Sequence, residues 1–214
     1  MTKEDRREMR GVAIVFGNKE RLQRFETSHE SYGTVLVNTD CENMLIARNA
    51  TYCEGSQWQA TLAFLLYNRE MWSQYDYLWF IGPHVNLSST QIATFFHTVT
   101  KHQSIIAQPC DPNSWQRDLH FKQNKSELRT VSFVESNAPC FTRAFVQAQL
   151  LPFLQDNRDH LCSGWGIDLW WSSRDHQRTM VVNTVTLDKE RSRVTTNETI
   201  AHAEKTHFCN KYNL

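Results

Sequence analysis

Short apolar runs alternate with amphipathic segments along the first half of the chain. The runs at 11–16, 34–38 and 75–81 are almost continuous in apolar residues, which is typical of strands that are buried on both faces of a sheet. Residues 57–73 instead place apolar side chains at helical spacing. Because strands and helices alternate in this way, the pattern predicts an α/β fold with a mixed, mostly parallel sheet and helices on both faces.

The second half of the chain continues the alternation with less regular spacing. We expect three further helices, at 89–101, 141–150 and 167–174. We expect three further strands, at 103–107, 130–134 and 179–185. Pro109 and Pro152 are expected to mark the ends of a strand and a helix, because proline has no backbone N–H to donate. Two polar segments, 114–129 and 199–213, are interpreted as a surface excursion and a tail.

The composition is that of one domain without a strongly charged surface. A chain of 214 residues is long enough for a single domain with a substantial core. Lys plus Arg and Asp plus Glu number 23 each, so no net charge favours nucleic acid or an anionic membrane. No apolar run approaches the roughly 18 to 20 residues that span a bilayer, and the first residues form no hydrophobic signal segment. We therefore expect a cytoplasmic protein with no nucleic-acid or membrane partner.

Turn-forming and polar residues follow three of the predicted strands. Gly17 and Asn18 come directly after the first strand, Asp40 after the second, and Gly82-Pro83-His84 after the third. Open α/β sheets bind ligands at the carboxyl ends of their strands, so these residues are candidates for a ligand site. Asp40 fits either a contact to a ribose hydroxyl or a simple turn aspartate, and the pattern does not choose between them.

The segment 162–171 carries the most distinctive local pattern in the chain. Two glycines flank a tryptophan in Gly164-Trp165-Gly166, which permits a turn that approaches a ligand closely. Asp168 follows in the first turn of a predicted helix, where the helix dipole favours an ionised carboxylate. This is a suitable place for a general base. The same pattern also fits an ordinary helix start with buried tryptophans.

Gly164-Trp165-Gly166 followed by an acid resembles a segment of inverting glycosyltransferases of the GT-A fold, in which the acid deprotonates the acceptor hydroxyl. Further segments, in the same order, resemble the plant proteins labelled "lysine ketoglutarate reductase trans-splicing related" and the small GT-A domain of chlorella-virus glycosyltransferases that build capsid glycans. The segments that carry this resemblance are 11–18, 34–40, 57–58, 75–79, 108–114, 138–144 and 165–168. The similarity covers about residues 11 to 205.

The resemblance implies a single GT-A-like (Rossmann-like) glycosyltransferase domain over residues 1–214. It would consist of a leader at 1–10, a nucleotide-sugar-binding half at 11–110 and an acceptor-binding half at 111–214. The implied reaction moves a hexose or deoxyhexose from a nucleoside-diphosphate sugar, with a UDP-sugar favoured, to a glycan or glycoprotein acceptor with inversion. Viral capsid glycosylation in a host cytoplasm is the setting that the viral relatives imply.

The resemblance also implies roles for particular residues. Asp168 would be the general base. The nucleotide sugar would lie across Phe16, Gly17, Asn18, Asp40, Gln57 and Trp58. Cys140 and Trp165 would line the acceptor site. Cys140 as a nucleophile has little support, because the sequence fixes no base beside it.

The chain departs from the family pattern at the metal site. The family has an acid-x-acid motif after the third strand, where this chain has Gly82-Pro83-His84. His84 and His202 are the candidate ligands for Mn²⁺ or Mg²⁺, because imidazole is an acceptable ligand for Mn²⁺. Each histidine is equally compatible with an ordinary surface or hydrogen-bonding residue.

Two other function classes stay open. Loss of the paired acids at 82–84 favours a catalytically silent domain that binds a nucleotide or a sugar. A metal-dependent hydrolase lacks support, because no His-x-His or His-x-x-x-His pair is present. The chain is also compatible with one domain of a larger glycosyltransferase.

Overall fold

The computed structural model describes most of the chain. The described residues are 9–17, 22, 28–29, 32–38, 50–52, 56–114, 116, 119, 126–174, 178–189 and 198–214. Most of the predicted leader lies outside these ranges, as do the predicted site residues Asn18 and Asp40.

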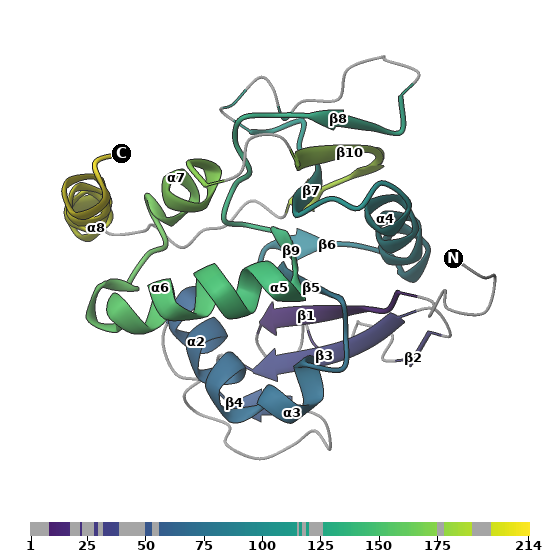
Figure 1. Cartoon of the computed structure of the whole chain (residues 1–214), viewed down its shortest axis with the longest axis horizontal. Helices are drawn as coiled ribbons and strands as arrows, with labels where there is room; N and C mark the ends of the chain where they lie inside the picture. The colour runs from purple at the N-terminus through teal and green to yellow at the C-terminus, as the bar shows by residue number, and fades with distance from the viewer. Residues whose placement is uncertain are drawn as a thin grey trace.

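A mixed sheet forms the centre of the molecule (Figure 1). Its strands are β1 (Gly11–Gly17), β2 (Ser28–His29), β3 (Tyr32–Asn38), β4 (Ala50–Tyr52), β5 (Tyr77–Ile81), β7 (Ile106–Cys110), β8 (Leu128–Thr130), β9 (Cys140–Thr142) and β10 (Thr179–Thr186). Within the described residues the strand order is β2-β3-β1-β5-β9-β7-β10-β8, with β4 paired to β3. Two short strands, β6 (Val85–Asn86) and β11 (Asp188–Lys189), form a separate antiparallel pair.

Parallel pairing dominates the middle of the sheet. Strand β1 pairs in parallel with β3 on one side and β5 on the other, and β7 pairs in parallel with β10. Strand β9 lies antiparallel between β5 and β7 and so joins the two parallel groups. The pairs β2–β3 and β8–β10 are also antiparallel. This arrangement confirms the predicted α/β class with a mixed, mostly parallel sheet.

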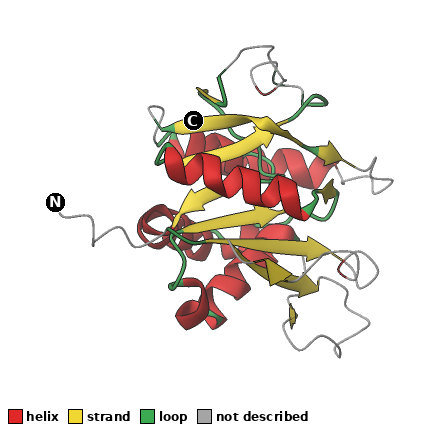
Figure 2. Ribbon diagram, turned by 90° about the vertical axis from the view of Figure 1, so that its right-hand side faces the viewer, coloured by secondary structure: helices red, strands yellow, loops and turns green. Residues whose placement is uncertain are grey.

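Helices cover both faces of the sheet. They are α2 (Gln57–Tyr67), α3 (Arg69–Trp72), α4 (Ser89–Lys101), α5 (Arg143–Phe145), the π-helix η2 (Val146–Leu150), α6 (Leu151–Asp156), the 3₁₀-helix η3 (Arg158–His160), α7 (Ile167–Ser172) and α8 (Glu198–Tyr212). Figure 2 views the side that carries α4 and shows a helix across one face of the strands, with further helices behind them. None of the helices in the described part of the chain has the length and apolar character of a membrane span.

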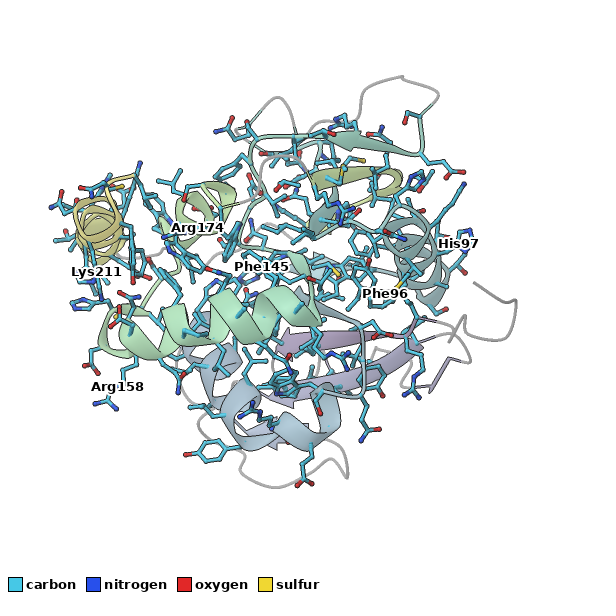
Figure 3. The ribbon with its side chains drawn as sticks, viewed as in Figure 1. Phe96, His97, Phe145, Arg158, Arg174 and Lys211 are labelled. Carbon is cyan, nitrogen blue, oxygen red and sulfur yellow. The ribbon has the colours of Figure 1, made fainter. Side chains whose placement is uncertain are left out.

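The alternation of side chains along β1 divides the core in two. Val12, Ile14 and Phe16 face one cluster, which includes aromatic residues of α2, α5, α6, α7 and α8. Ala13 and Val15 face the other, which α4 closes. Figure 3 labels one aromatic side chain from each cluster, Phe145 on α5 and Phe96 on α4. Both faces of β1 are therefore buried, as the continuous apolar run predicts.

The helices α2 and α4 each begin directly after a capping serine. Ser56 and Gln59 form a capping box at the start of α2, and Ser88 and Gln91 form another at the start of α4. The predicted helix at 89–101 is confirmed. The predicted helix at 57–73 is two helices, because the backbone leaves helical geometry at Asn68 and α3 begins after it.

Two predicted strands have other bounds in the structure than in the prediction, because pairing with distant segments sets where they begin and end. The predicted strand at 103–107 is β7, which begins later and includes Pro109. Strand β9 pairs only with Ile106 and Ala107, so Pro109 lies where β7 has a neighbour on one side only and a missing N–H is tolerated. The predicted strand at 130–134 is β8 and ends at Thr130.

The predicted helix at 141–150 begins later and ends later than the pattern suggested. Its first residues belong to β9, and helix α5 starts at Arg143. Pro152 does not end the helix, because the backbone widens into the π-helix η2 just before it and continues as α6 to Asp156. The segment predicted as a polar tail at 199–213 is helix α8, which buries Ala201, Glu204 and Phe208.

Substitution of Gly11 by alanine tests the packing of α4 on the sheet. A Cβ atom at Gly11 would overlap the ring of Phe96. We expect Gly11→Ala to lower the free energy of unfolding by about 1 to 3 kcal/mol, the usual cost of overpacking a core. Urea denaturation measures the change. In a Phe96→Leu background the same substitution should cost less, and an equal cost in both backgrounds would contradict the assigned contact.

Candidate functional site

The predicted base Asp168 lies in the first turn of α7, after a turn that we call the Trp165 turn (residues 163–166). Gly164 and Gly166 adopt left-handed backbone conformations with φ of 83° and 87°, which favour glycine at both positions. The indole of Trp165 stands between them and is 41% exposed. The two-glycine pattern therefore produces the predicted turn, and it brings an exposed aromatic ring close to Asp168 in the chain.

The carboxyl group of Asp168 is in a poorly hydrated place. Burial raises its pKa to about 7, backbone hydrogen bonds from Leu169 and Ser136 oppose this rise, and the charge of Glu135 adds to it. The Leu169 N–H lies 3.0 Å from Asp168 Oδ1. The effect of burial on this pKa therefore exceeds that of the short helix α7. An acid with this pKa changes its protonation state near neutral pH.

Ser136 connects Asp168 to the predicted nucleotide-site residue Gln57. Its backbone N–H hydrogen-bonds to Asp168, and its carbonyl oxygen accepts from Gln57 Nε2 at 3.4 Å. The next residue, Asn137, accepts from the N–H of Gly82 at 2.8 Å through its own carbonyl. The segment 135–137 thus crosses the carboxyl end of β5 and brings Gln57, Gly82 and Asp168 together.

Glu135 belongs to a buried set of charges that we call the ionic cluster (Asp111, Glu135 and Lys189). Lys189 Nζ lies 2.9 Å from Glu135 Oε2 and also pairs with Asp111. Ser114 Oγ donates to Glu135 Oε1 at 2.5 Å and Asn137 Nδ2 donates to Oε2 at 3.2 Å. Burial alone would raise the pKa of Glu135, but Lys189 and these donors lower it below the ordinary value of 4.5. Glu135 is therefore a fixed negative charge beside Asp168.

Lys189 reaches this cluster through the β6–β11 pair. Lys189 stands opposite Val85, immediately beyond the Gly82-Pro83-His84 turn. At Gly82 a Cβ atom would lie 2.7 Å from both the carbonyl oxygen of Asn137 and Gln57 Oε1. The space that an acidic side chain at position 82 would need is thus filled by Gln57 and by the backbone of Asn137. Lys189 lies close to this turn, because it pairs with Val85.

Three predicted site residues have side chains in the core. Phe16 is 0% exposed, Trp58 2% and Cys140 1%, so in this structure these side chains support the site from inside the protein. The ring of Trp58 lies against Gly164, where a Cβ atom would be 2.6 Å from Trp58 Cδ1. Burial raises the pKa of the Cys140 thiol well above its ordinary value, which disfavours a thiolate nucleophile. Gly17 is a buried residue at the end of β1.

The two predicted histidine ligands lie on different elements. His84 is an exposed residue in the turn before β6, whereas His202 is exposed on α8 and meets the ring of Trp165 edge to face at 5.4 Å. Within the part of the chain that the structure describes, no three histidine, cysteine, aspartate or glutamate side chains gather in a way that could hold a metal ion.

Sequence reasoning missed the ionic cluster and Glu204 of α8. Glu135 follows the predicted strand at 130–134 directly, the same signal that singled out Asp40, so it was accessible to that rule. Asp111 directly follows the observed strand β7 but not the strand predicted at 103–107. Lys189 and Glu204 gave no local signal, because their roles depend on β-pairing and helix docking between distant segments.

The comparison with solved structures identifies the fold of the chain. The chain has a GT-A-like α/β fold, of the kind shared by glycosyltransferases and nucleotidyltransferases, with its polar cluster at the carboxyl ends of the strands. No protein-family model matches the sequence, and no curated protein sequence matches it.

Solved structures resemble the chain at low sequence identity. The crystal structure of GalNAc-T7 with UDP, GalNAc and Mn²⁺ has a TM-score of 0.59 at 11% identity, and the match covers 96% of this chain and 51% of that chain. The structure of A197 from STIV has a TM-score of 0.45 at 13% identity, covering 88% of this chain and 97% of that chain. The chain thus spans about half the length of the GalNAc-T7 structure.

A third similar structure is that of 4-diphosphocytidyl-2C-methyl-D-erythritol synthase from Anaerococcus prevotii DSM 20548. It has a TM-score of 0.43 at 11% identity, with 94% of this chain and 96% of that chain covered. The similarity to the GalNAc-T7 structure, at 11% identity, establishes the fold, and the reaction must be argued from the residues of this chain.

Replacement of Lys189 tests the ionic cluster. Lys189→Met leaves Asp111 and Glu135 buried without their cation, so we expect the free energy of unfolding at pH 7 to fall by about 3 kcal/mol. Lys101→Met is the matched control, because the Lys101–Glu127 pair is exposed and screened by solvent, so its loss should have a much smaller effect. Chemical denaturation of both variants measures the difference.

The pH dependence of the Lys189→Met deficit gives a second check. The lowered pKa of Glu135 contributes stability above the ordinary value of 4.5, and this contribution is lost as the pH falls through the lowered pKa. The deficit of Lys189→Met should therefore shrink in acid. A deficit that stays constant from pH 7 down to pH 3 would argue against the cluster as its source.

Proposed function

We propose that this domain is a glycosyltransferase that moves a sugar from a nucleoside-diphosphate sugar to a hydroxyl group of a glycan or glycoprotein, with Asp168 as the general base. The observation that carries the proposal is a carboxyl group with a pKa near 7 at the carboxyl edge of a GT-A-like sheet. A base is most effective when its pKa lies near the working pH.

An inverting transfer is the mechanism that we propose. In its ionised form Asp168 accepts the proton of the acceptor hydroxyl while the hydroxyl oxygen bonds to the anomeric carbon. The bond from that carbon to the diphosphate oxygen breaks on the opposite face, and the nucleoside diphosphate leaves with the electron pair. The exposed indole of Trp165, close to Asp168 in the chain, offers an apolar face for the acceptor sugar.

A UDP-sugar, with a hexose or deoxyhexose, is the donor that we propose. GalNAc-T7, which shares the fold, was crystallised with UDP and GalNAc. In this chain the amide of Gln57 lies beside Ser136 and Gly82, at the carboxyl end of β5. Asn18 and Asp40, which we propose as further nucleotide contacts, follow the neighbouring strands β1 and β3 in sequence.

The residues at the predicted metal position do not fit a divalent ion. An acid in place of Gly82 would collide with Asn137 and Gln57, and His202 packs on Trp165. The two buried carboxylates of the ionic cluster are already paired with Lys189. We therefore derive no step of the transfer through a metal ion.

A catalytically silent nucleotide- or sugar-binding domain is the second candidate function. Its specific support is the packed Gly82, which occupies the place where GT-A enzymes resembling this chain carry an acid. The two candidates share a nucleotide site and differ in the role of Asp168, so the experiments below separate them.

Asp168→Asn tests the base. Removal of a general base should lower kcat/KM for transfer by about 10²- to 10⁴-fold while UDP affinity is kept. For the wild type, kcat/KM should rise with pH through about 7, because the ionised form of Asp168 is the active one. A pH profile that is flat from pH 5 to pH 9 would contradict this assignment.

The same variant has an expected effect on stability. The raised pKa of Asp168 favours folding below its ordinary value of 3.8, and this contribution is lost as the pH rises through about 7. Asp168→Asn removes the cost of an ionised buried carboxylate, so thermal unfolding at pH 8 should occur at a higher temperature than in the wild type. The gain should shrink as the pH falls from about 7 and disappear below about 3.8.

Isothermal titration of UDP and GDP tests donor binding directly. We expect UDP to bind, and its affinity in EDTA to stay within about tenfold, or 1.4 kcal/mol, of its affinity in Mn²⁺, because the described residues form no metal site. Binding without any transfer or donor hydrolysis would favour the silent domain. No binding of either nucleotide would contradict both candidates.

A further inference from the structure

The Trp165 turn depends on contacts from outside itself. Gly164 and Gly166 have no side chains, and their left-handed conformations are accessible to glycine but not specified by it. Among the described residues 163–166, the hydrogen bond within the turn is that from the Trp165 N–H to Ser163 Oγ at 3.2 Å. The position of the exposed indole must therefore be set by neighbouring elements.

Glu204 of helix α8 supplies the main polar contacts to this turn. Its Oε2 atom accepts from the Ser163 N–H at 2.6 Å and from Ser163 Oγ at 2.7 Å, and its Oε1 atom accepts from the Gly164 N–H at 2.9 Å. Glu204 is only 4% exposed. Because Ser163 Oγ also accepts from Trp165, the carboxylate is connected to the backbone of the tryptophan through one hydroxyl.

Close packing holds the turn on two sides. At Gly164 a Cβ atom would lie 2.6 Å from Cδ1 of Trp58, which projects from α2. At Gly166 a Cβ atom would lie 2.9 Å from the Cα atom of Lys205, the residue after Glu204 on α8. The turn is thus enclosed between α2 and α8, and Glu204 orients it within that space.

Helix α8 is attached to the domain independently of Glu204. Phe208 is fully buried and contacts the ring of Phe153 on α6 at 5.4 Å. Near its C-terminal end, Tyr212 Oη accepts from Asn157 Nδ2 at 2.7 Å and Lys211 pairs with Asp156 at 2.7 Å. Figure 3 labels Lys211 on this helix. The docking of α8 therefore does not need a buried carboxylate.

Burial of a carboxylate destabilises the folded state unless hydrogen bonds compensate for its lost hydration. Burial raises the pKa of Glu204 above its ordinary value, which reflects this cost. Its hydrogen bonds go to Ser163 and Gly164, and the backbone of Cys162, just before the turn, also lowers its pKa. These hydrogen bonds indicate that the buried carboxylate holds the Trp165 turn, which ends two residues before Asp168.

We propose that Glu204 is a positioning residue, which fixes the Trp165 turn so that the indole of Trp165 and the carboxyl of Asp168 keep one relative placement for the acceptor sugar. This inference rests on the proposed glycosyl transfer. It makes α8 a functional part of the acceptor side, with Glu204 acting through Ser163 and Gly164 and not by touching substrate.

Glu204→Gln is the test variant. It keeps the size of the side chain but replaces one carboxylate oxygen by an NH₂ group, so at least one N–H of the turn faces a second donor. Glu198→Gln is the matched control, because it makes the same change at an exposed position on the same helix. Ser163→Ala is a second variant, which removes the linking hydroxyl from a partly exposed residue if Glu204→Gln fails to fold.

Two measurements are made on all four proteins. We expect Glu204→Gln and Ser163→Ala to lower kcat/KM for the acceptor by at least about tenfold, with the UDP dissociation constant unchanged within about twofold. We also expect amide hydrogen exchange at Gly164, followed by ¹H–¹⁵N NMR, to accelerate at least about tenfold in both variants. Glu198→Gln should match the wild type in each.

The outcomes separate the positioning role from the proposed function. Wild-type exchange at Gly164 in both variants overturns the inference, as does faster exchange with an unchanged kcat/KM. A parallel loss of UDP affinity also overturns it, because that result indicates a general structural role. If the wild type neither binds UDP nor transfers sugar, the proposed function fails, and the positioning role for the acceptor fails with it. The exchange data still establish in that case whether Glu204 holds the turn.

Discussion

Strand β9 is inserted antiparallel between β5 and β7, and the architecture of the site follows from this one pairing. Its hydrogen bonds join the parallel group around β1 to the parallel pair of β7 and β10. To enter the sheet in this direction, the chain must first cross the carboxyl ends of the strands. Segment 134–139 makes that crossing, and Trp79 and Phe80 of β5 hold its second half through bonds to Ala138 and Pro139.

The crossing segment explains why a group of acids is tolerated at this edge. Val134 accepts from the indole N–H of Trp171 and donates to Ser172, so the segment is fixed to α7, which carries Asp168. Glu135 is neutralised by Lys189 in the ionic cluster, whereas no cation of the described residues pairs with Asp168, whose pKa stays raised. Two carboxyl groups on neighbouring segments thus have opposite shifts, and only Asp168 can exchange a proton near neutral pH.

The sequence was most informative where a local pattern and the tertiary structure agree. The apolar runs of β1, β3 and β5, the capping box at Ser88 and the two-glycine turn were predictable because each is specified by adjacent residues. Strand β9 and the β6–β11 pair were not, because two- and three-residue strands depend on their partners. Helix α8 was missed because its buried positions include Glu204, which a search for apolar periodicity counts as surface.

The burial that makes Asp168 a plausible base is also a cost to folding, and this links the site to the core beneath it. An ionised carboxylate that is poorly hydrated destabilises the folded state, so the surrounding packing must hold it in place. Trp171 and Trp58 lie under the Trp165 turn and α7, with ring centroids 5.1 Å apart, and Trp171 anchors the crossing segment. The tryptophans of this region therefore divide by position. Trp58 and Trp171 are core and pack beneath the segment that carries Asp168, the proposed base, whereas Trp165, three residues before Asp168 in the chain, is exposed.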